Sequence, residues 1–117
     1  MSEESVLANL IVELRRGTQI ISVLSQLQKN QYGYSLLQDL QNMYINIEAG
    51  TLYPLMRRLE SQEILKSEWD TTESRPRKYY ILSPMGKEVL VQLKDEWYKL
   101  ANEMDQIFKE ERKWRIW

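Results

Sequence analysis

The chain has 117 residues, of which 43% are hydrophobic and 28% charged, as is typical of one folded domain with an accessory helix. It contains no cysteine and no histidine, which excludes disulfides, thiolate metal ligands and the usual neutral-pH base. The sequence also has no glycine-rich phosphate loop and no nucleophile motif. We therefore expect no catalytic site, no metal site and no cofactor.

Charge is distributed unevenly along the chain. The net charge is −1, so the protein as a whole lacks the basic character that is common among nucleic-acid binders. Residues 1–14 carry acids only, whereas residues 15–83 carry a slight excess of lysine and arginine. No apolar stretch approaches the roughly 20 residues of a spanning helix, and the N-terminus is acidic where a signal peptide would be basic. We expect a cytoplasmic protein without a membrane partner.

Two helices are predicted before residue 31. The apolar face of the first helix ends at the polar segment 15–17 and consists of Leu7, Leu10, Ile11 and Leu14. Thr18 is suited to cap the second helix, which we expect to end near Lys29 and Asn30. The apolar residues of this second helix recur at the spacing of one helical face and are Ile20, Val23, Leu24 and Leu27.

Two further helices are predicted between residues 32 and 62. The segment 32–34 forms a turn into the third helix, in which we expect Leu37, Leu40 and Tyr44 to point inward. The fourth helix extends from about Ala49 to Gln62, and its buried stripe consists of Leu52, Leu55, Met56 and Leu59. Three short helices in succession form a helix-turn-helix unit.

A β-hairpin is predicted after Glu63, where the hydrophobic pattern changes from the helical period to the alternation typical of strands. Residues 64–69 and 78–82 predict two strands, and the polar segment 70–76 predicts the turn between them. The hairpin is thus appended to the helical unit.

Ser83 and Pro84 predict the start of the last helix, because a hydroxyl can cap free amides and proline is tolerated at the first helical position. We expect this helix to end at about Arg112. Its apolar residues alternate in spacing between three and four, as in a seam for a partner helix, and are Leu90, Leu93, Trp97, Leu100, Met104 and Ile107. With the apolar face of the first helix, this seam predicts a homodimer interface. The expected fold is mainly α with a small β-hairpin: a winged helix-turn-helix with a long C-terminal dimerisation helix.

Several local motifs make this architecture more specific. They are Arg16-Gly17-Thr18, Tyr32-Gly33-Tyr34, Gly50-Thr51-Leu52-Tyr53-Pro54-Leu55, Arg58-Leu59-Glu60, Arg77-Lys78-Tyr79-Tyr80-Ile81-Leu82 and Gly86. In order and spacing these motifs resemble the PadR family of transcriptional regulators, and the single helix after the hairpin resembles its short subtype. The resemblance implies a homodimeric repressor of transcription that binds a palindromic operator in double-stranded DNA and is released by a small aromatic or drug-like effector. Residues 1–83 would form the DNA-binding domain and residues 84–117 the dimerisation helix.

The fourth predicted helix is the expected recognition helix. Away from its buried stripe it carries the candidate DNA-binding residues Gly50, Thr51, Tyr53, Pro54 and Arg57. Tyr53 and Arg57 can contact base edges from the major groove, and Gly50 leaves the helix start open to a phosphate. We expect Pro54 close to the first turn, with Glu48 or Asn46 at the N-terminal end of the helix. The alternative is that Tyr53 packs locally and Arg57 is a solvated cation.

The hairpin supplies a second set of candidate contacts. Arg75, Arg77 and Lys78 flank Pro76, where they can bind a phosphate or enter a minor groove. The alternative is that these cations only solubilise the hairpin. Tyr34 and Ser35, at the start of the third helix, are candidate phosphate donors, with local capping as an equal alternative.

Trp97 is a candidate effector-binding residue because an indole is large for the close packing of two helices. Together with Leu93 and Leu100 it would line a site at the dimer axis, where Asp95 or Glu96 favours a cationic aromatic ligand. The alternative is that Trp97 belongs to the dimer core. For the whole chain, the alternative function is a protein-interaction module that uses the same winged helix and does not bind DNA.

Overall fold

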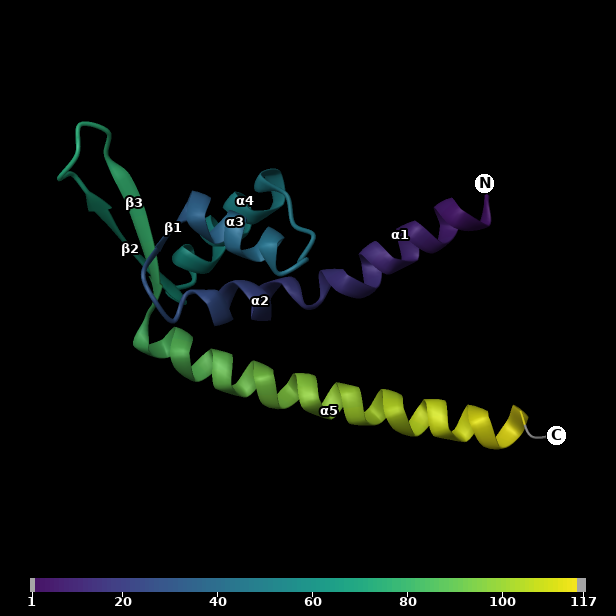
Figure 1. Cartoon of the computed structure of the whole chain (residues 1–117). Helices are drawn as coiled ribbons and strands as arrows, with labels where there is room; N and C mark the ends of the chain where they lie inside the picture. The colour runs from purple at the N-terminus through teal and green to yellow at the C-terminus, as the bar shows by residue number, and fades with distance from the viewer. Residues whose placement is uncertain (1, 116–117) are drawn as a thin grey trace.

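The computed structural model describes residues 2–115, with side chains described for residues 2–111. The elements in chain order are α1 (Glu3–Arg16), α2 (Gln19–Gln26), β1 (Gln31–Tyr32), α3 (Gly33–Asn42), α4 (Ala49–Ser61), β2 (Leu65–Asp70), β3 (Arg77–Leu82) and α5 (Pro84–Arg115). Figure 1 shows α2, α3 and α4 packed together beside the hairpin of β2 and β3, while α1 and α5 extend away from this unit. The predicted fold, a winged helix with a long C-terminal helix, is confirmed.

The sheet has three strands, one more than the sequence predicts. Its order is β1-β3-β2, with β3 paired antiparallel to both neighbours. Tyr32 of β1 lies opposite Tyr79, and Asp70 at the end of β2 lies opposite Arg77. The two residues of β1 are too few to show an alternating pattern, so only their pairing with β3 identifies them as a strand. We call the hairpin of residues 65–82 the wing.

The core lies between α2, α3, α4, the base of the wing and the first turns of α5. Its most enclosed side chains are Val23, Leu24, Leu27, Leu36, Leu40, Leu52, Met56 and Leu65. Leu90 of α5 is only 3% exposed and belongs to this same core. Its assignment to the dimer seam was therefore wrong, because the subunit itself covers it. Leu93, one turn further along, is partly buried against the core.

The prediction that the Tyr44 side chain points inward is wrong, because Tyr44 is 90% exposed just after the end of α3. Tyr44 has a φ of 61°, in the left-handed region that often terminates helices. The amide of Ile45 donates to the carbonyl of Leu40 at 2.9 Å, and the amide of Tyr44 donates to that of Gln41 at 3.0 Å. This Schellman geometry ends α3 at Asn42, two residues before Tyr44, and Ile47 takes the buried position that follows.

Several details at helix ends bear on the sequence-based predictions. Helix α2 ends at Gln26, earlier than predicted. Thr18 occupies the predicted N-cap of α2, but its hydroxyl donates to the carbonyl of Arg15 and makes no capping hydrogen bond. Of the two candidates for the N-cap of α4, Glu48 occupies the position, and its side chain makes no capping hydrogen bond. Pro54 lies inside α4, beyond the first turn. Because proline has no N–H, the carbonyl four residues earlier, that of Gly50, loses its helical donor.

The start of α5 is held against the end of α4. As predicted, Ser83 caps α5: its hydroxyl accepts the amide of Gly86 at 2.9 Å. The same hydroxyl lies 2.6 Å from the Glu63 carbonyl oxygen, to which it can donate. A Cβ added to Gly86 would lie 2.2 Å from the carbonyl oxygen of Ile64. Only glycine therefore allows α5 to approach this backbone so closely.

Helix α1 contributes no side chain to the hydrophobic core of the subunit. None of its residues is buried, and the molecule measures 68 × 36 × 22 Å because α1 and α5 project from the core. No helix among the described residues has the length and apolar character needed to cross a bilayer.

We expect Gly86→Ala to lower the free energy of unfolding by about 1–3 kcal/mol, the usual cost of forcing extra volume into a packed site. Gly50→Ala is the matched control, because an added Cβ there meets nothing within 4 Å. In a helix this change should raise stability by about 0.5–1 kcal/mol. Urea unfolding at equal protein concentration measures both effects, and equal stabilities for the two variants would contradict the close contact.

Candidate nucleic-acid interface

Helix α4 presents part of its surface to solvent. Gly50, Thr51, Pro54 and Arg57 are exposed, as the sequence predicts for a recognition helix. Tyr53 is half-buried and packs against the core, and a Cβ on Gly33 would lie 3.0 Å from its Cε1 atom. The ring of Tyr53 therefore packs against the start of α3, which leaves Arg57 as the more accessible of the two predicted base contacts.

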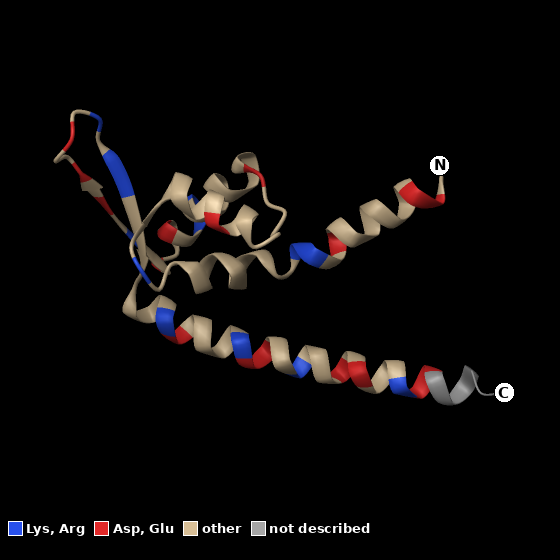
Figure 2. Ribbon diagram, in the orientation of Figure 1, with Lys and Arg blue, Asp and Glu red and all other residues tan. Residues whose placement is uncertain are grey.

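The wing carries cations on β3 and its turn, and acids on β2 and the other side of the turn (Figure 2). Arg75 and Arg77 are exposed. The Arg77 guanidinium lies 3.6 Å from the Glu73 carboxylate and 5.1 Å from the centre of the Tyr32 ring. Because both partners are exposed, this ion pair stabilises the fold little and leaves Arg77 available to another anion.

Lys78 lies deeper in the wing than the two arginines. Its ammonium group is 3.1 Å from the Glu60 carboxylate on the last turn of α4, and both side chains are 29% exposed. The rings of Tyr80 and Trp69 lie 5.3 Å and 6.0 Å from the same nitrogen. The structure thus separates Lys78 from the cations of the wing tip with which the sequence analysis grouped it.

A tyrosine pair joins the three strands at the middle of the sheet. The Tyr32 and Tyr79 hydroxyls are 2.5 Å apart, and their rings stack with centres 4.2 Å apart. Both hydroxyls also lie within hydrogen-bonding distance of the Asp70 carboxylate, at 3.1 and 3.3 Å, so one tyrosine donates to the other while the second donates to Asp70. The hydrogen bond with Tyr32, together with burial and the nearby carboxylate, raises the pKa of Tyr79 to about 12. Hydrogen bonds from Thr72 are the main reason that the pKa of Asp70 is lowered.

A groove of about 670 Å³ lies between the start of α3, α4 and the wing. Its lining residues are Tyr32, Gly33, Tyr34, Ser35, Gln38, Tyr53, Arg75, Arg77, Lys78 and Tyr80. The Ser35 hydroxyl donates to the Tyr32 carbonyl at 3.0 Å, and the Tyr34 hydroxyl accepts the Gln38 amide at 3.2 Å. The groove thus brings together most of the residues proposed from the sequence and includes no acidic side chain.

Comparison with known proteins assigns this geometry to a family. The model of the transcriptional regulator PadR-like family matches residues 20–92, which is more than half of the chain. The chain belongs to this family. A PadR-family transcriptional regulator of Eggerthella lenta, of known structure, is 46% identical, with a TM-score of 0.86 over 90% of this chain and 94% of that one.

Two further relatives agree with this assignment. A PadR-like transcription factor of Bacteroides fragilis is 32% identical, with a TM-score of 0.70 over 85% of this chain and 98% of that one. A transcriptional regulator of Mycobacterium tuberculosis is 30% identical over 79% of this chain and 87% of its own length. PadR-family proteins are DNA-binding regulators of transcription, so this chain is a transcriptional regulator and not an enzyme.

The PadR match contains α4, the wing and the first turns of α5 but neither α1 nor the distal part of α5. Arg16 of α1 nevertheless contributes to a second hollow, of about 570 Å³, beside α4. It is lined by Arg16, Gln19, Ile20, Gly50, Thr51, Pro54, Leu55 and Arg58. Neither Arg16 nor Arg58 was proposed as a contact from the sequence, because helical periodicity places both at ordinary solvent-facing positions.

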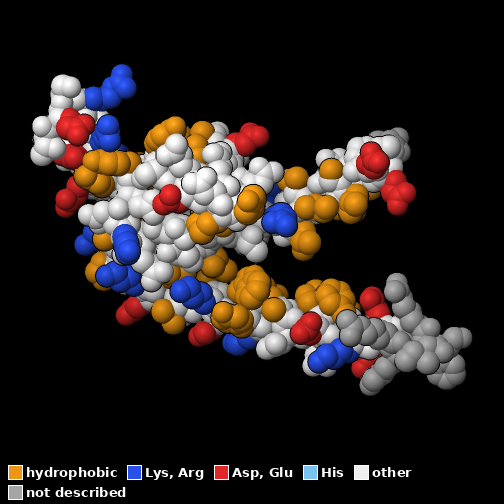
Figure 3. All heavy atoms as spheres, viewed as in Figure 1, with side chains coloured by type: hydrophobic (Ala, Val, Ile, Leu, Met, Phe, Trp, Pro, Cys, Tyr) orange, Lys and Arg blue, Asp and Glu red, His pale blue; other side chains and the backbone are white. Residues whose placement is uncertain are grey.

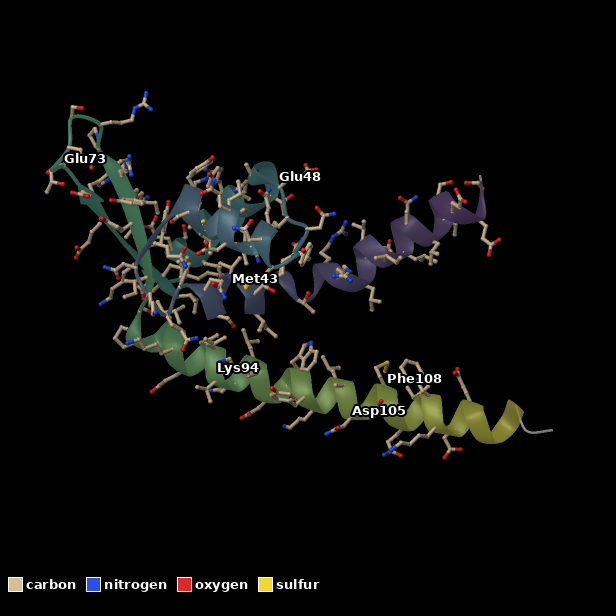
Figure 4. All side chains as sticks on the ribbon, viewed as in Figure 1. Met43, Glu48, Glu73, Lys94, Asp105 and Phe108 are labelled. Carbon is tan, nitrogen blue, oxygen red and sulfur yellow. The ribbon has the colours of Figure 1, made fainter. Side chains whose placement is uncertain are left out.

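Acidic side chains limit the surface that DNA could occupy. Figure 4 shows Glu48 just before α4 and Glu73 in the turn of the wing, so an acid lies near each of the two candidate DNA-contacting elements. Among the described residues there is no group of three or more acids that could hold a metal ion. The arrangement is suited to binding an anion through cations and hydroxyls.

Proposed function

We propose that this PadR-family protein is a homodimeric repressor that binds palindromic double-stranded DNA. The groove between α3, α4 and the wing carries the proposal, because the cations Arg75, Arg77 and Lys78 line it without an acid. In winged-helix recognition a helix enters the major groove while other elements contact the phosphate backbone. Here α4 would enter the major groove and the wing would contact the backbone beside it.

The proposal divides the contacts between the two elements. Arg57 is exposed on α4, where a guanidinium can donate two hydrogen bonds to a guanine edge and so select a sequence. Arg75 and Arg77 lie on the wing, where they would bind phosphates of any sequence. At the helix start, exposed Gly50 and Thr51 leave room for a phosphate near amides that already favour anions.

The dimer would form through α1 and α5, which carry the largest apolar surfaces. Figure 3 shows hydrophobic side chains along the edges of α1 and α5 that face each other across an open space. The exposed apolar residues along these helices include Leu7, Leu10, Ile11, Leu14, Trp97, Leu100, Met104, Ile107 and Phe108. In Figure 4, Phe108 projects from α5 toward the side on which α1 lies. A second copy would cover both helices and, by twofold symmetry, would present two α4 helices to two half-sites.

The proposed effector site lies on α5 within this dimer interface. Trp97 is 43% exposed and meets Tyr98 edge to face at 5.4 Å. Two indoles related by the dimer axis could enclose a planar aromatic ligand. Glu96 forms an ion pair with Lys99 at 3.5 Å, and Asp95, two residues from Trp97, projects to the other side of the helix. Of the two acids, Glu96 is thus already paired with a cation and Asp95 lies away from the indole.

We expect Arg57→Ala to weaken binding to the selected operator by about 1–3 kcal/mol but to change nonspecific binding little. Arg75→Gln should weaken both and should reduce the slope of log affinity against log salt by about 1. Selection from a random DNA pool would supply the operator, and fluorescence anisotropy would measure affinity. A pool without a recovered palindrome, and affinity independent of salt, would favour a protein-interaction module.

We expect Leu100→Glu to convert the dimer to monomer, because it introduces a charge into the apolar seam. Val91→Glu is the matched control, since Val91 is 60% exposed on another side of α5, and it should leave the dimer intact. Sedimentation velocity at micromolar concentration measures both variants. A monomeric parent protein would refute the interface.

Trp97 should respond to ligand in a variant that keeps it as the sole tryptophan. We expect saturable quenching of its emission by flat aromatic cations, with each cation–π contact contributing about 0.5–2 kcal/mol. Trp97→Ala should lose ligand binding but remain a dimer that binds DNA. Dissociation of Trp97→Ala into monomers, without quenching by any ligand in the parent, would assign Trp97 to the dimer core.

A further inference from the structure

One carboxylate connects the recognition helix to both strands of the wing. Glu60, on the last turn of α4, accepts a hydrogen bond from the Ser67 hydroxyl of β2. It also accepts one from the Lys78 ammonium group of β3 at 3.1 Å. Ser67 and Tyr80 are directly paired in the hairpin, as are Trp69 and Lys78. Glu60 thus makes a polar contact from α4 to both strands of the wing.

The charges at this contact are mutually stabilised. Glu60 has a lowered pKa, caused first by the Ser67 hydrogen bond and also by Lys78. Lys78 has a raised pKa, caused first by its hydrogen bond to Glu60. Both shifts favour the ionised pair near neutral pH. The ammonium group is also flanked by the rings of Tyr80 and Trp69, so Lys78 has a defined position before any DNA is present.

The wing extends beyond the helices as a two-stranded ribbon, joined to them only at its base (Figure 1). Its direction relative to α4 therefore depends on the contacts at that base. Tyr32, Tyr79 and Asp70 connect the three strands to one another, but they do not connect the sheet to α4. Glu60 supplies a polar connection, beside the apolar core that Leu59 of α4 shares with Leu65 and Leu82 of the wing.

We propose that Glu60 is a positioning residue for DNA binding, which holds the wing through Lys78 and Ser67 at the angle to α4 that lets both elements contact one duplex. The inference rests on the proposed function and revises one part of it. Lys78 acts through Glu60, and the phosphate contacts come from Arg75 and Arg77. Arg75 makes no ion pair with any described residue and lies at the exposed turn.

The direction in which one substitution changes DNA affinity distinguishes a positioning role of Glu60 from simple electrostatic repulsion. Glu60→Gln removes a negative charge from the protein near the wing, which by Coulomb attraction alone would strengthen binding to a polyanion. Positioning predicts the opposite result, a loss of roughly threefold to fivefold, as expected for one partly exposed ion pair. Glutamine has the length of glutamate and can still accept from Ser67. Glu68→Gln, on an exposed acid of β2, is the matched control and should leave affinity unchanged or slightly raised.

A double-mutant cycle tests whether Lys78 acts through the same pair. Lys78→Gln should weaken binding about as much as Glu60→Gln, and the double variant should be no weaker than either single variant. Lys78→Gln should also leave the salt slope unchanged, whereas Arg75→Gln should reduce it by about 1. Additive losses, or a salt slope reduced by Lys78→Gln, would make Lys78 a phosphate contact and overturn the proposal, as would unchanged or tighter binding by Glu60→Gln.

Hydrogen exchange without DNA provides an independent measurement. Glu60→Gln should increase exchange of the amides of β2 and β3 severalfold and leave those of α2 and α3 unchanged, while Glu68→Gln should alter neither set. Equal exchange in Glu60→Gln and the parent would overturn the positioning role. A parent protein that binds no duplex at any salt concentration would instead refute the proposed function, and the exchange result would still decide whether Glu60 holds the wing.

Discussion

The recognition helix, the wing and the long C-terminal helix meet at two backbone carbonyl groups, those of Glu63 and Ile64. The Ser83 hydroxyl donates to the Glu63 carbonyl at 2.6 Å and lies 3.1 Å from that of Ile64, to which the Ser83 amide donates at 3.0 Å. Glu63 itself has a φ of 64°, which turns the chain sharply from α4 into β2. Because this junction is packed and fully hydrogen-bonded, α4 and the start of α5 form one rigid unit.

Much of the fold could be predicted because its elements bury one regular face each. The stripe on α4 and the Ser83–Pro84 start of α5 follow from local pattern and local chemistry. Tyr44 could not be placed correctly, since the helical period gives no sign of the left-handed residue that interrupts it. Leu90 could not either, because seam spacing shows that a face is covered but not whether the same subunit or a partner covers it.

The candidate site was predicted in outline but not in its internal connections. The cations of the wing could be recognised from their positions around Pro76. Which of them is committed to a partner depends on Glu60, which is 18 residues from Lys78 in the sequence and 3.1 Å away in space. Side-chain partners across different elements follow from the register of the strands and the placement of the helix, and neither is visible in residue types alone.

Helix α1 has a consequence for how this regulator would respond to its own abundance. A helix of 14 residues with no buried side chain is marginal in water by itself, so under the proposed assembly its folding depends on a second copy. The ordered, operator-competent species would then increase with the square of monomer concentration when monomer predominates. Occupancy of the operator would rise more steeply with the number of copies in the cell than it would for a regulator that folds alone. This steepness would require no coupling between the two DNA-binding domains.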